Sequence, residues 1–495
     1  MNTDPMHRFS LFLPTLILPV LLLGTAESYG LQKKPNVVFI CIDDMRPDLG
    51  CYGDSVAHSP NLDALASSAT VFSNHFAVVP TCGASRASLL TGKLPKTVQD
   101  LSNEACVTNK RTDDQYPETF IAHLKNNGYY TVGIGKISHY TDGYVYPYDS
   151  MRSDRLELPN SWNEMLFDPG KWGTGWNAFF GYADGSNRQS EKGNVPPYEK
   201  ADVADNGYPD GLTADLAVRK IGELAKGDNP FFLSVGFFKP HLPFTAPAKY
   251  WDLIDSAKIQ LTPSPAIPEH VNRTSLHNSG EFNQYLKGDE KATLDSPLTD
   301  AYARKLRHAY YACIAYTDAQ IGRIMQALDR HGLTENTVVV VWSDHGWHLG
   351  DHRVWGKHTL FERSLKNVLI IKEPGAKGQV CNQVVSSVDI YPTVVALCKV
   401  APVRNIDGQS LVPLLRNPQL PSWRNTAYSY FNRGISLFTP DDHLIRYFRE
   451  DAPAMELYSR QEDRFENINI AGHRPEILQK LLTHLENDHQ ARRIW

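Results

Sequence analysis

Cysteine, basic excess and long apolar runs are all scarce in this sequence of 495 residues. Seven cysteines are too few for a disulfide framework in a chain of this length, and the odd number leaves at least one unpaired. The formal net charge of -5 provides no basic excess of the kind that binds a nucleic-acid backbone, so we exclude a nucleic-acid partner. The 42% of hydrophobic residues is ordinary for a globular protein with a large core.

The most apolar stretch lies near the N-terminus, at residues 11–23, after His7 and Arg8. It is shorter than the roughly 20 apolar residues of a membrane-spanning helix, and two prolines interrupt it. Small residues follow at 24–28 and suit cleavage by signal peptidase near Ser28. We therefore expect a signal peptide at residues 1–28, export to the periplasm or out of the cell, and no stable membrane span. A membrane anchor is the alternative.

Short apolar runs recur along the chain, at residues 37–42, 129–134, 231–238, 338–342 and 368–371. Such runs are typical of parallel strands that are buried on both faces. Helical spacing fills segments between them, for example at residues 303–328. This alternation predicts an α/β fold.

The pattern changes after about residue 400, where prolines become frequent and short strand-like pieces such as 443–448 appear. A helix with apolar residues at helical spacing is expected at residues 475–486. We therefore place a catalytic domain at residues 31–420 and a small C-terminal subdomain at residues 421–495. Residues 180–215, rich in Gly, Asp, Asn and Pro, indicate a long surface loop near the site.

Polar residues follow each of the first four apolar runs. In open α/β sheets ligands bind beyond the carboxyl ends of the strands, so these side chains should converge on one crevice. In chain order they are Asp43 and Asp44, Lys136 and His139, Lys239 and His241, and Asp344 and His345. The sequence therefore predicts a single site.

Cys82 precedes a predicted helix at residues 85–90, which Gly92 should end. The first turn of a helix offers free N–H groups and a positive dipole end, so an anion such as sulfate is favoured there. Arg86, one turn along, is suited to bind the anion through charge-assisted hydrogen bonds. The alternative is a buried cysteine at an ordinary helix start.

Residues 82–93, with the sequence CGASRASLLTGK, resemble the signature of the type I sulfatases. In that family the cysteine is oxidised to formylglycine, and the hydrate of formylglycine supplies the nucleophilic hydroxyl. The resemblance implies a partner that carries out the oxidation, either a formylglycine-generating enzyme or a radical-type sulfatase-maturating enzyme. Ala84 stands where proline is commoner in the signature, and the radical-type enzymes accept alanine there.

The adjacent Asp43 and Asp44 would repel one another unless a cation lies between them. Asp344 and His345 would complete a mostly oxygen shell suited to Ca²⁺. In the resembling family the formylglycine also binds calcium, so the expected metal ligands are Asp43, Asp44, Cys82, Asp344 and His345. The alternative for the aspartate pair alone is a solvated turn.

Several segments are similar to the iduronate-2-sulfatases, and the resemblance implies roles for particular residues. Lys136 and His139 would hold the formylglycine hydrate, and His139 would accept one of its protons. His241 would protonate the leaving alcohol, for which the near-neutral pKa of imidazole suits it. Lys357 would bridge the sulfate and the leaving oxygen, and Asp344 would accept the proton of the nucleophile.

The resemblance runs from residue 35 to about 486 and implies an alkaline-phosphatase-like sandwich. That fold has a large, mixed and mostly parallel sheet flanked by helices, with a small C-terminal antiparallel sheet. The implied substrate is a sulfated glycan. Trp347 is a candidate sugar platform and His358 a second substrate contact, while Phe438 stands where relatives often have arginine, which indicates a less acidic sugar.

Three alternatives to an iduronate-2-sulfatase-like enzyme remain. One is a sulfatase of another polysaccharide, and the second is a phosphodiesterase or phosphonate hydrolase of the same superfamily. The third is an inactive glycan-binding protein in which Cys82 stays a thiol, since a fold alone never establishes activity. The sequence leaves open the position of the ester, exo or endo action and the oligomeric state.

Overall fold

The computed structural model describes residues 1–2, 34–108, 118–488 and 494 of the chain. Residues 35–495 form one compact unit, and the fold below is that of this unit. Apart from its first two residues, the signal peptide expected at residues 1–28 lies outside the described residues. Within the described ranges, no helix is both long enough and apolar enough to cross a membrane.

A mixed sheet of eight strands forms the centre of the unit. In spatial order its strands are β12 (Gln379–Ser386), β2 (Thr70–Phe76), β11 (Leu369–Lys372), β8 (Thr337–Ser343), β1 (Asn36–Ile42), β6 (Phe231–Phe237), β3 (Tyr130–Gly135) and β4 (Glu164–Leu166). Five of the strand pairs are parallel, and β11 is antiparallel to both of its neighbours. The central strand β1 is wholly buried, as its run of β-branched and apolar residues predicts.

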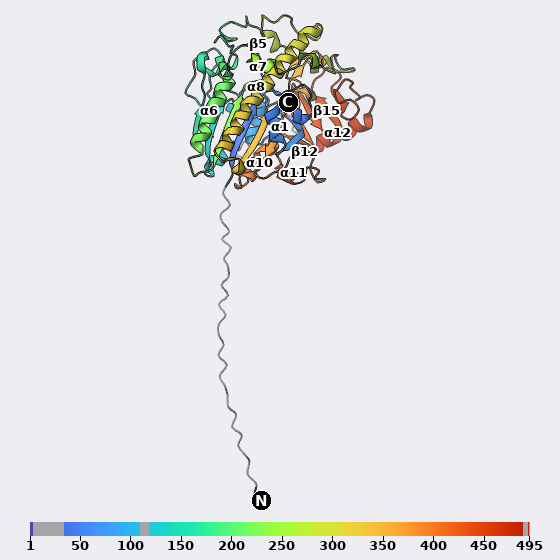
Figure 1. The fold of residues 1–495 in the computed structure, drawn as a ribbon. Coiled ribbons are helices and arrows are strands. Elements are labelled where there is room, and N and C mark those ends of the chain that lie inside the picture. The colour runs from blue at the N-terminus through green and yellow to red at the C-terminus, as the bar shows by residue number, and fades with distance from the viewer. Residues whose placement is uncertain (3–33, 109–117, 489–493, 495) are drawn as a thin grey trace. The chain divides into compact units, whose positions relative to one another are not determined.

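Helices lie between and after these strands (Figure 1). Their bounds are α1 (Pro60–Ala66), α2 (Cys82–Thr91), α3 (Ala105–Thr108), α4 (Phe120–Asn126), α5 (Gly175–Phe179), α6 (Pro209–Leu224), α7 (Ala248–Trp251), α8 (Asp300–Arg330), α9 (Glu362–Leu365), α10 (Ile390–Leu397), α11 (Val412–Arg416) and α12 (Pro475–Asn487). Thr299 caps α8 by accepting a hydrogen bond from the N–H of Tyr302. Proline begins α6 and α12, where its missing N–H costs nothing.

The helices cover both faces of the sheet, because successive side chains of a strand point to opposite faces. Val38 and Ile40 of β1 belong to a core cluster that includes residues of α1, α6 and α8. Val37 and Phe39 of the same strand belong to a second cluster, with residues of α2, α4 and α10. Figure 1 shows α6 in green and α8 in yellow, running side by side. The sheet is therefore the middle layer of a sandwich.

A smaller antiparallel sheet follows in the C-terminal part of the chain. Its strands, in order, are β13 (Ala427–Phe431), β14 (Gly434–Phe438), β15 (Asp442–Tyr447) and β16 (Met455–Ser459). Helix α12 contributes Leu481, Leu482 and Leu485 to the same core cluster as Leu437 and Leu444 of this sheet. Two further pairs are β5 (Tyr198–Ala201) with β7 (Phe244–Pro247), and β9 (His348–Leu349) with β10 (Trp355–Gly356).

The predicted α/β fold with a large, mostly parallel sheet and a small antiparallel sheet is confirmed. The five apolar runs correspond to β1, β3, β6, β8 and β11, and the helices predicted at residues 303–328 and 475–486 correspond to α8 and α12. The parallel direction expected of β11 is wrong. Between β8 and β11 the chain forms the β9–β10 hairpin, a 3-10 helix at Asp351–Arg353 and the four-residue α9, so no crossover returns it to the other end of the sheet.

Candidate active site

The carboxyl ends of four strands of the large sheet place polar side chains together, as the sequence predicted. Asp43 and Asp44 follow β1, Lys136 follows β3, His241 lies beyond β6, and Asp344 follows β8. All five side chains are buried. The converging strands of an α/β sheet thus build the site.

Cys82 is the first residue of α2 and follows the extended residue Thr81, so the helix begins three residues earlier than predicted. Its first turn leaves main-chain N–H groups without helical partners. Gly83 is required here, because a Cβ at this position would lie 2.1 Å from the main-chain oxygen of Asn103. The predicted end of the helix at Gly92 is confirmed, with the left-handed φ of 63° that favours glycine.

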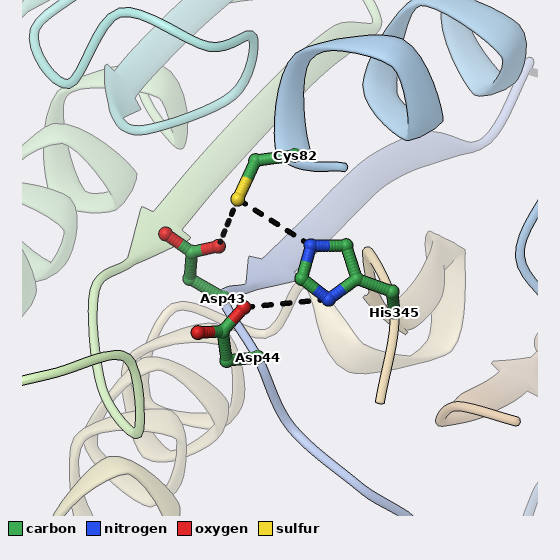
Figure 2. A group of neighbouring side chains, drawn as sticks. All are labelled: Asp43, Asp44, Cys82 and His345. Carbon is green, nitrogen blue, oxygen red and sulfur yellow. Dashed lines mark hydrogen bonds and ion pairs between the residues drawn. The ribbon is translucent and has the colours of Figure 1, made fainter. Parts of the chain in front are cut away.

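The sulfur of Cys82 lies 3.4 Å from each of three polar atoms, which are Oδ1 of Asp43, Nε2 of His345 and Nζ of Lys357. Figure 2 shows the first two of these contacts. Burial, reinforced by Asp43, raises the pKa of the Cys82 thiol well above its usual range, against the opposing effect of Lys357. An unmodified Cys82 would therefore remain a protonated thiol and a weak nucleophile.

Asp43, Asp44, Cys82 and His345 each offer a ligand atom, and these atoms lie within 4.8 Å of one another (Figure 2). His345 stands between Cys82 and Asp44, since its Nδ1 lies 3.3 Å from Oδ1 of Asp44. The structure thus brings together four of the five residues that the sequence assigned to a metal.

Asp344, the fifth expected ligand, lies beside this group with its carboxylate held by hydrogen-bond donors. Its Oδ2 accepts from Nε of Arg86 at 3.1 Å and lies 3.0 Å from Nη2 of the same guanidinium. Its Oδ1 accepts from the main-chain N–H groups of Asp44 and His345, both at 3.0 Å. Asp344 therefore anchors Arg86. The carboxylate in contact with the Cys82 sulfur is that of Asp43, and the expected role of Asp344 as the acceptor of the nucleophile's proton stays a prediction.

The two adjacent carboxylates behave differently in this buried site. Burial favours the neutral form of Asp43, but Lys136, His241 and Arg86 outweigh it and hold the pKa of this carboxyl well below its usual range. At Asp44 burial dominates over Lys357 and raises the pKa to about 7. Lys357 donates to both carboxylate oxygens of Asp44, at 3.0 and 3.1 Å, and a further cation beside the pair would favour the ionised form of this carboxyl.

Lys136 and His139 belong to the segment that follows β3. The ammonium group of Lys136 forms an ion pair with Asp43 and lies 4.2 Å from the ring centroid of Phe179. Burial, together with the charge of Lys136, lowers the pKa of His139 well below its usual range. The Nδ1 of the neutral His139 ring is buried and has no hydrogen-bond partner among the described residues.

His241 and Lys357 share Glu281, which sequence reasoning missed. Nε2 of His241 lies 2.9 Å from Oε1 of Glu281, and Nζ of Lys357 lies 3.5 Å from Oε2. Burial raises the pKa of Glu281, but Lys357 and His241 outweigh it and hold the pKa well below its usual range. Glu281 follows no strand end and belongs to no motif, so the sequence contained no signal for it.

Comparison with known families agrees with this geometry. Residues 35–400 match the family described as Sulfatase, and residues 350–491 match the C-terminal region of N-sulphoglucosamine sulphohydrolase. The chain belongs to the sulfatase family.

Individual sulfatases and a solved structure extend this similarity. The chain is 31% identical over 381 residues to iduronate 2-sulfatase of Mus musculus, which covers 74% of this chain and 64% of the relative. It is 32% identical over 353 residues to iduronate 2-sulfatase of Homo sapiens, which covers 69% of this chain and 60% of the relative. The chain thus spans less than two thirds of either relative. Phosphonate monoester hydrolase from Silicibacter pomeroyi, 23% identical, shares the fold with a TM-score of 0.71 over 92% of this chain and 96% of its own.

A cavity of about 270 Å³ opens beside Cys82 of this sulfatase-family chain. The catalytic candidates Lys136, His139, His241 and Lys357 line it. Its remaining lining is largely aromatic and consists of Tyr148, Trp176, Phe179, Phe180, His358, Asn103, Arg188, Glu281 and Gln284. Of the loop predicted at residues 180–215, Phe180 and Arg188 reach the cavity, whereas β5 and the start of α6 occupy its later part.

The two expected sugar contacts have different positions. The side chain of Trp347 is wholly buried behind Lys357, whose Nζ lies 5.3 Å from its ring centroid, so no sugar can stack on it. This corrects the expectation that Trp347 is a stacking platform for the sugar. His358 lines the cavity and stacks on Phe431 with ring centroids 5.5 Å apart. It also lines a second cavity of about 600 Å³, so it is placed for contact with substrate.

Proposed function

We propose that this chain hydrolyses sulfate esters of a sulfated glycan, with a nucleophile supplied by oxidation of Cys82 to formylglycine. The observation that carries the proposal is the position of Cys82, in the family's motif, at the first turn of α2 and 3.4 Å from Asp43, His345 and Lys357. The iduronate 2-sulfatase relatives favour a sulfated uronic acid as the substrate. A sulfatase of another polysaccharide is the alternative with the same chemistry.

The donor set fits calcium. Asp43 and Asp44 supply carboxylate oxygens, His345 supplies a ring nitrogen, and the side chain derived from Cys82 would replace sulfur by oxygen. Asp344 borders the set and keeps Arg86 in place. Calcium bound there would draw charge from the sulfate group and so stabilise the transition state.

The cationic side chains of the site bind and orient the sulfate. Lys357 has its Nζ 3.4 Å from Sγ of Cys82, so its charge lies where the sulfate oxygens must come. Lys136 contributes a second positive charge in the same cavity. Arg86 is wholly buried and donates to the main-chain oxygen of Lys136 at 2.7 Å, so it stiffens the site behind the nucleophile.

His241 is the group that protonates the leaving oxygen of the sugar. Its Nδ1 lies 2.7 Å from the main-chain oxygen of Leu242, which assigns the Nδ1–H and turns Nε2 towards Glu281 and the cavity. Burial and Lys357 lower the pKa of His241, and Glu281 opposes them. The neutral His139 lines the same cavity and is suited to accept a proton from the nucleophile.

Maturation must precede folding, because Cys82 is only 5% exposed and the whole of α2 is buried. The partner that the sulfatase resemblance implies, a formylglycine-generating or radical-type sulfatase-maturating enzyme, would therefore act on the unfolded chain. The leader at residues 1–28 would then direct the protein to the periplasm or out of the cell.

The test is sulfate release by protein co-expressed with a maturating enzyme, with conversion of Cys82 measured by mass spectrometry. Sulfated uronic-acid oligosaccharides, sulfated neutral oligosaccharides, a phosphodiester and a phosphonate monoester form the panel, and Cys82→Ala is the control. We expect sulfate release that Cys82→Ala abolishes. If converted protein releases no sulfate from the panel, the proposal fails. Faster cleavage of the phosphorus esters would favour the phosphodiesterase alternative, and no cleavage at all would favour a glycan-binding protein.

A further inference from the structure

The wall of the cavity carries a positive charge that the proposed hydrolysis does not use. Arg188 lines the same cavity as Cys82 and His241. Its guanidinium carbon lies 3.7 Å from the ring centroid of Phe180 and 5.5 Å from that of Tyr285. Both rings are buried, so the guanidinium rests on a rigid apolar surface.

The main chain holds Arg188 in this position. Its N–H donates to the oxygen of Phe180 at 3.2 Å, and its own oxygen accepts from the N–H of Gly193 at 2.8 Å. The preceding residue, Asn187, is buried and its side-chain oxygen accepts from the N–H of Ser190 at 2.9 Å. The loop is thus a defined turn that presents its arginine to the cavity.

No carboxylate neutralises this guanidinium among the residues that the structure describes. The acidic residue of the same cavity, Glu281, is engaged by Nε2 of His241 at 2.9 Å and by Nζ of Lys357 at 3.5 Å. A guanidinium stacked on an aromatic face keeps its N–H donors free along its edge, and these donors match the two oxygens of a carboxylate or sulfate.

We propose that Arg188 forms a subsite for a second anionic group on the substrate, separate from the sulfate that is hydrolysed. The group is a carboxylate or a further sulfate, on the sulfated sugar or on its neighbour. This inference rests on the proposed function and makes the preferred substrate a glycan with a second negative charge near the scissile ester.

The subsite reverses an expectation from the sequence. Phe438, which stands where relatives often have arginine, indicated a less acidic sugar. In the structure Phe438 is wholly buried and stacks between Phe76 and His443, with ring centroids 3.8 Å away on each side. It lines neither cavity described here, so its identity says nothing about their charge. The basic group comes instead from Arg188.

The experiment compares kcat/KM of the matured protein on matched substrates. One pair is a sulfated uronic-acid oligosaccharide and the same oligosaccharide with its carboxyl groups reduced to alcohols. The second pair is a monosulfated and a disulfated form of the reduced oligosaccharide. The variants are Arg188→Ala and Arg188→Lys, and the control is Arg152→Ala, whose guanidinium lies 4.3 Å from the ring centroid of Tyr144 but does not line the cavity.

We expect wild type to prefer the anionic member of at least one pair, and Arg188→Ala to reduce that preference about tenfold or more, mainly through KM. Arg188→Lys should restore part of it, and Arg152→Ala should leave it unchanged. The pair that responds identifies the group as carboxylate or sulfate. Equal losses on both members, or an unchanged preference in Arg188→Ala, would overturn the subsite while leaving sulfate hydrolysis intact. Wild-type protein that releases no sulfate would instead count against the proposed function.

Discussion

The carboxylate of Glu281 bridges His241 and Lys357, with Oε1 2.9 Å from Nε2 of the histidine and Oε2 3.5 Å from Nζ of the lysine. We assign His241 to the leaving oxygen of the sugar and Lys357 to the sulfate. Glu281 therefore positions both of them at once, and it balances their charge in a buried site.

Glu281→Gln should lower kcat about tenfold to a hundredfold, because the neutral amide holds His241 and Lys357 less firmly. It should also change the pH profile. Glu281 raises the pKa of His241, so the variant should lose the protonated histidine at lower pH, and the alkaline limb of kcat should move towards lower pH. Glu191→Gln, an exposed residue of the neighbouring loop, is the control. A lower kcat with an unmoved limb would leave Glu281 with a structural role only.

Removal of calcium by a chelator should lower both the melting temperature and the rate of sulfate release, and added calcium should restore both. A ligand at a hundred times its Kd stabilises the folded state by about 2.7 kcal/mol. Asp44→Asn should lose most of this calcium-dependent rise in melting temperature. Asp48→Asn, from the same loop but paired with Arg46, should keep it. The same rise in Asp44→Asn as in wild type would contradict the metal site.

Arg86→Ala should destabilise the protein by about 3–5 kcal/mol, because it leaves the buried carboxylate of Asp344 without its cation. Arg86→Lys keeps the charge but lacks the planar fork, so an intermediate loss is expected. Urea unfolding of all variants measures the effect. The surface pair Arg416 with Glu373, in which the arginine is 66% exposed, supplies the control Arg416→Ala, with an expected cost of at most about 1 kcal/mol. Equal costs for the two alanine variants would refute the anchoring role of Arg86.

Glu456 of β16 should make stability fall as the pH rises. Burial raises the pKa of its carboxyl from 4.5 to about 7, against the hydrogen bonds from Ser275 and Tyr458. The folded protein keeps a proton that the unfolded chain releases above pH 4.5. The stabilisation is therefore complete below pH 4.5 and is lost as the pH rises through about 7.

Glu456→Gln is neutral at every pH and should remove this part of the decline. The measurement is the difference in melting temperature between about pH 5 and about pH 8, which should be smaller in the variant. An identical difference in both proteins would mean that Glu456 is ionised in the fold.

The sequence by itself determined the features that depend on local spacing. Apolar runs predicted β1, β3, β6, β8 and β11, and the motif around Cys82 predicted the helix that begins at this residue. Strands β2 and β12 were not predicted, because polar residues such as Asn74 and Asn382 interrupt their apolar patterns. Convergence of Asp43, Lys136 and Asp344 followed from a general property of α/β sheets.

Only the tertiary structure decided which of these polar residues touch one another. In the folded protein the carboxylate of Asp344 pairs with Arg86, and Trp347 is buried behind Lys357. Glu281 and Arg188 line the cavity, although the segments that contain them carry no motif. Each of these outcomes depends on the packing of segments that lie far apart in the chain. Local patterns of residues do not encode such contacts, because the direction of a buried side chain is set by neighbours that the fold alone brings near.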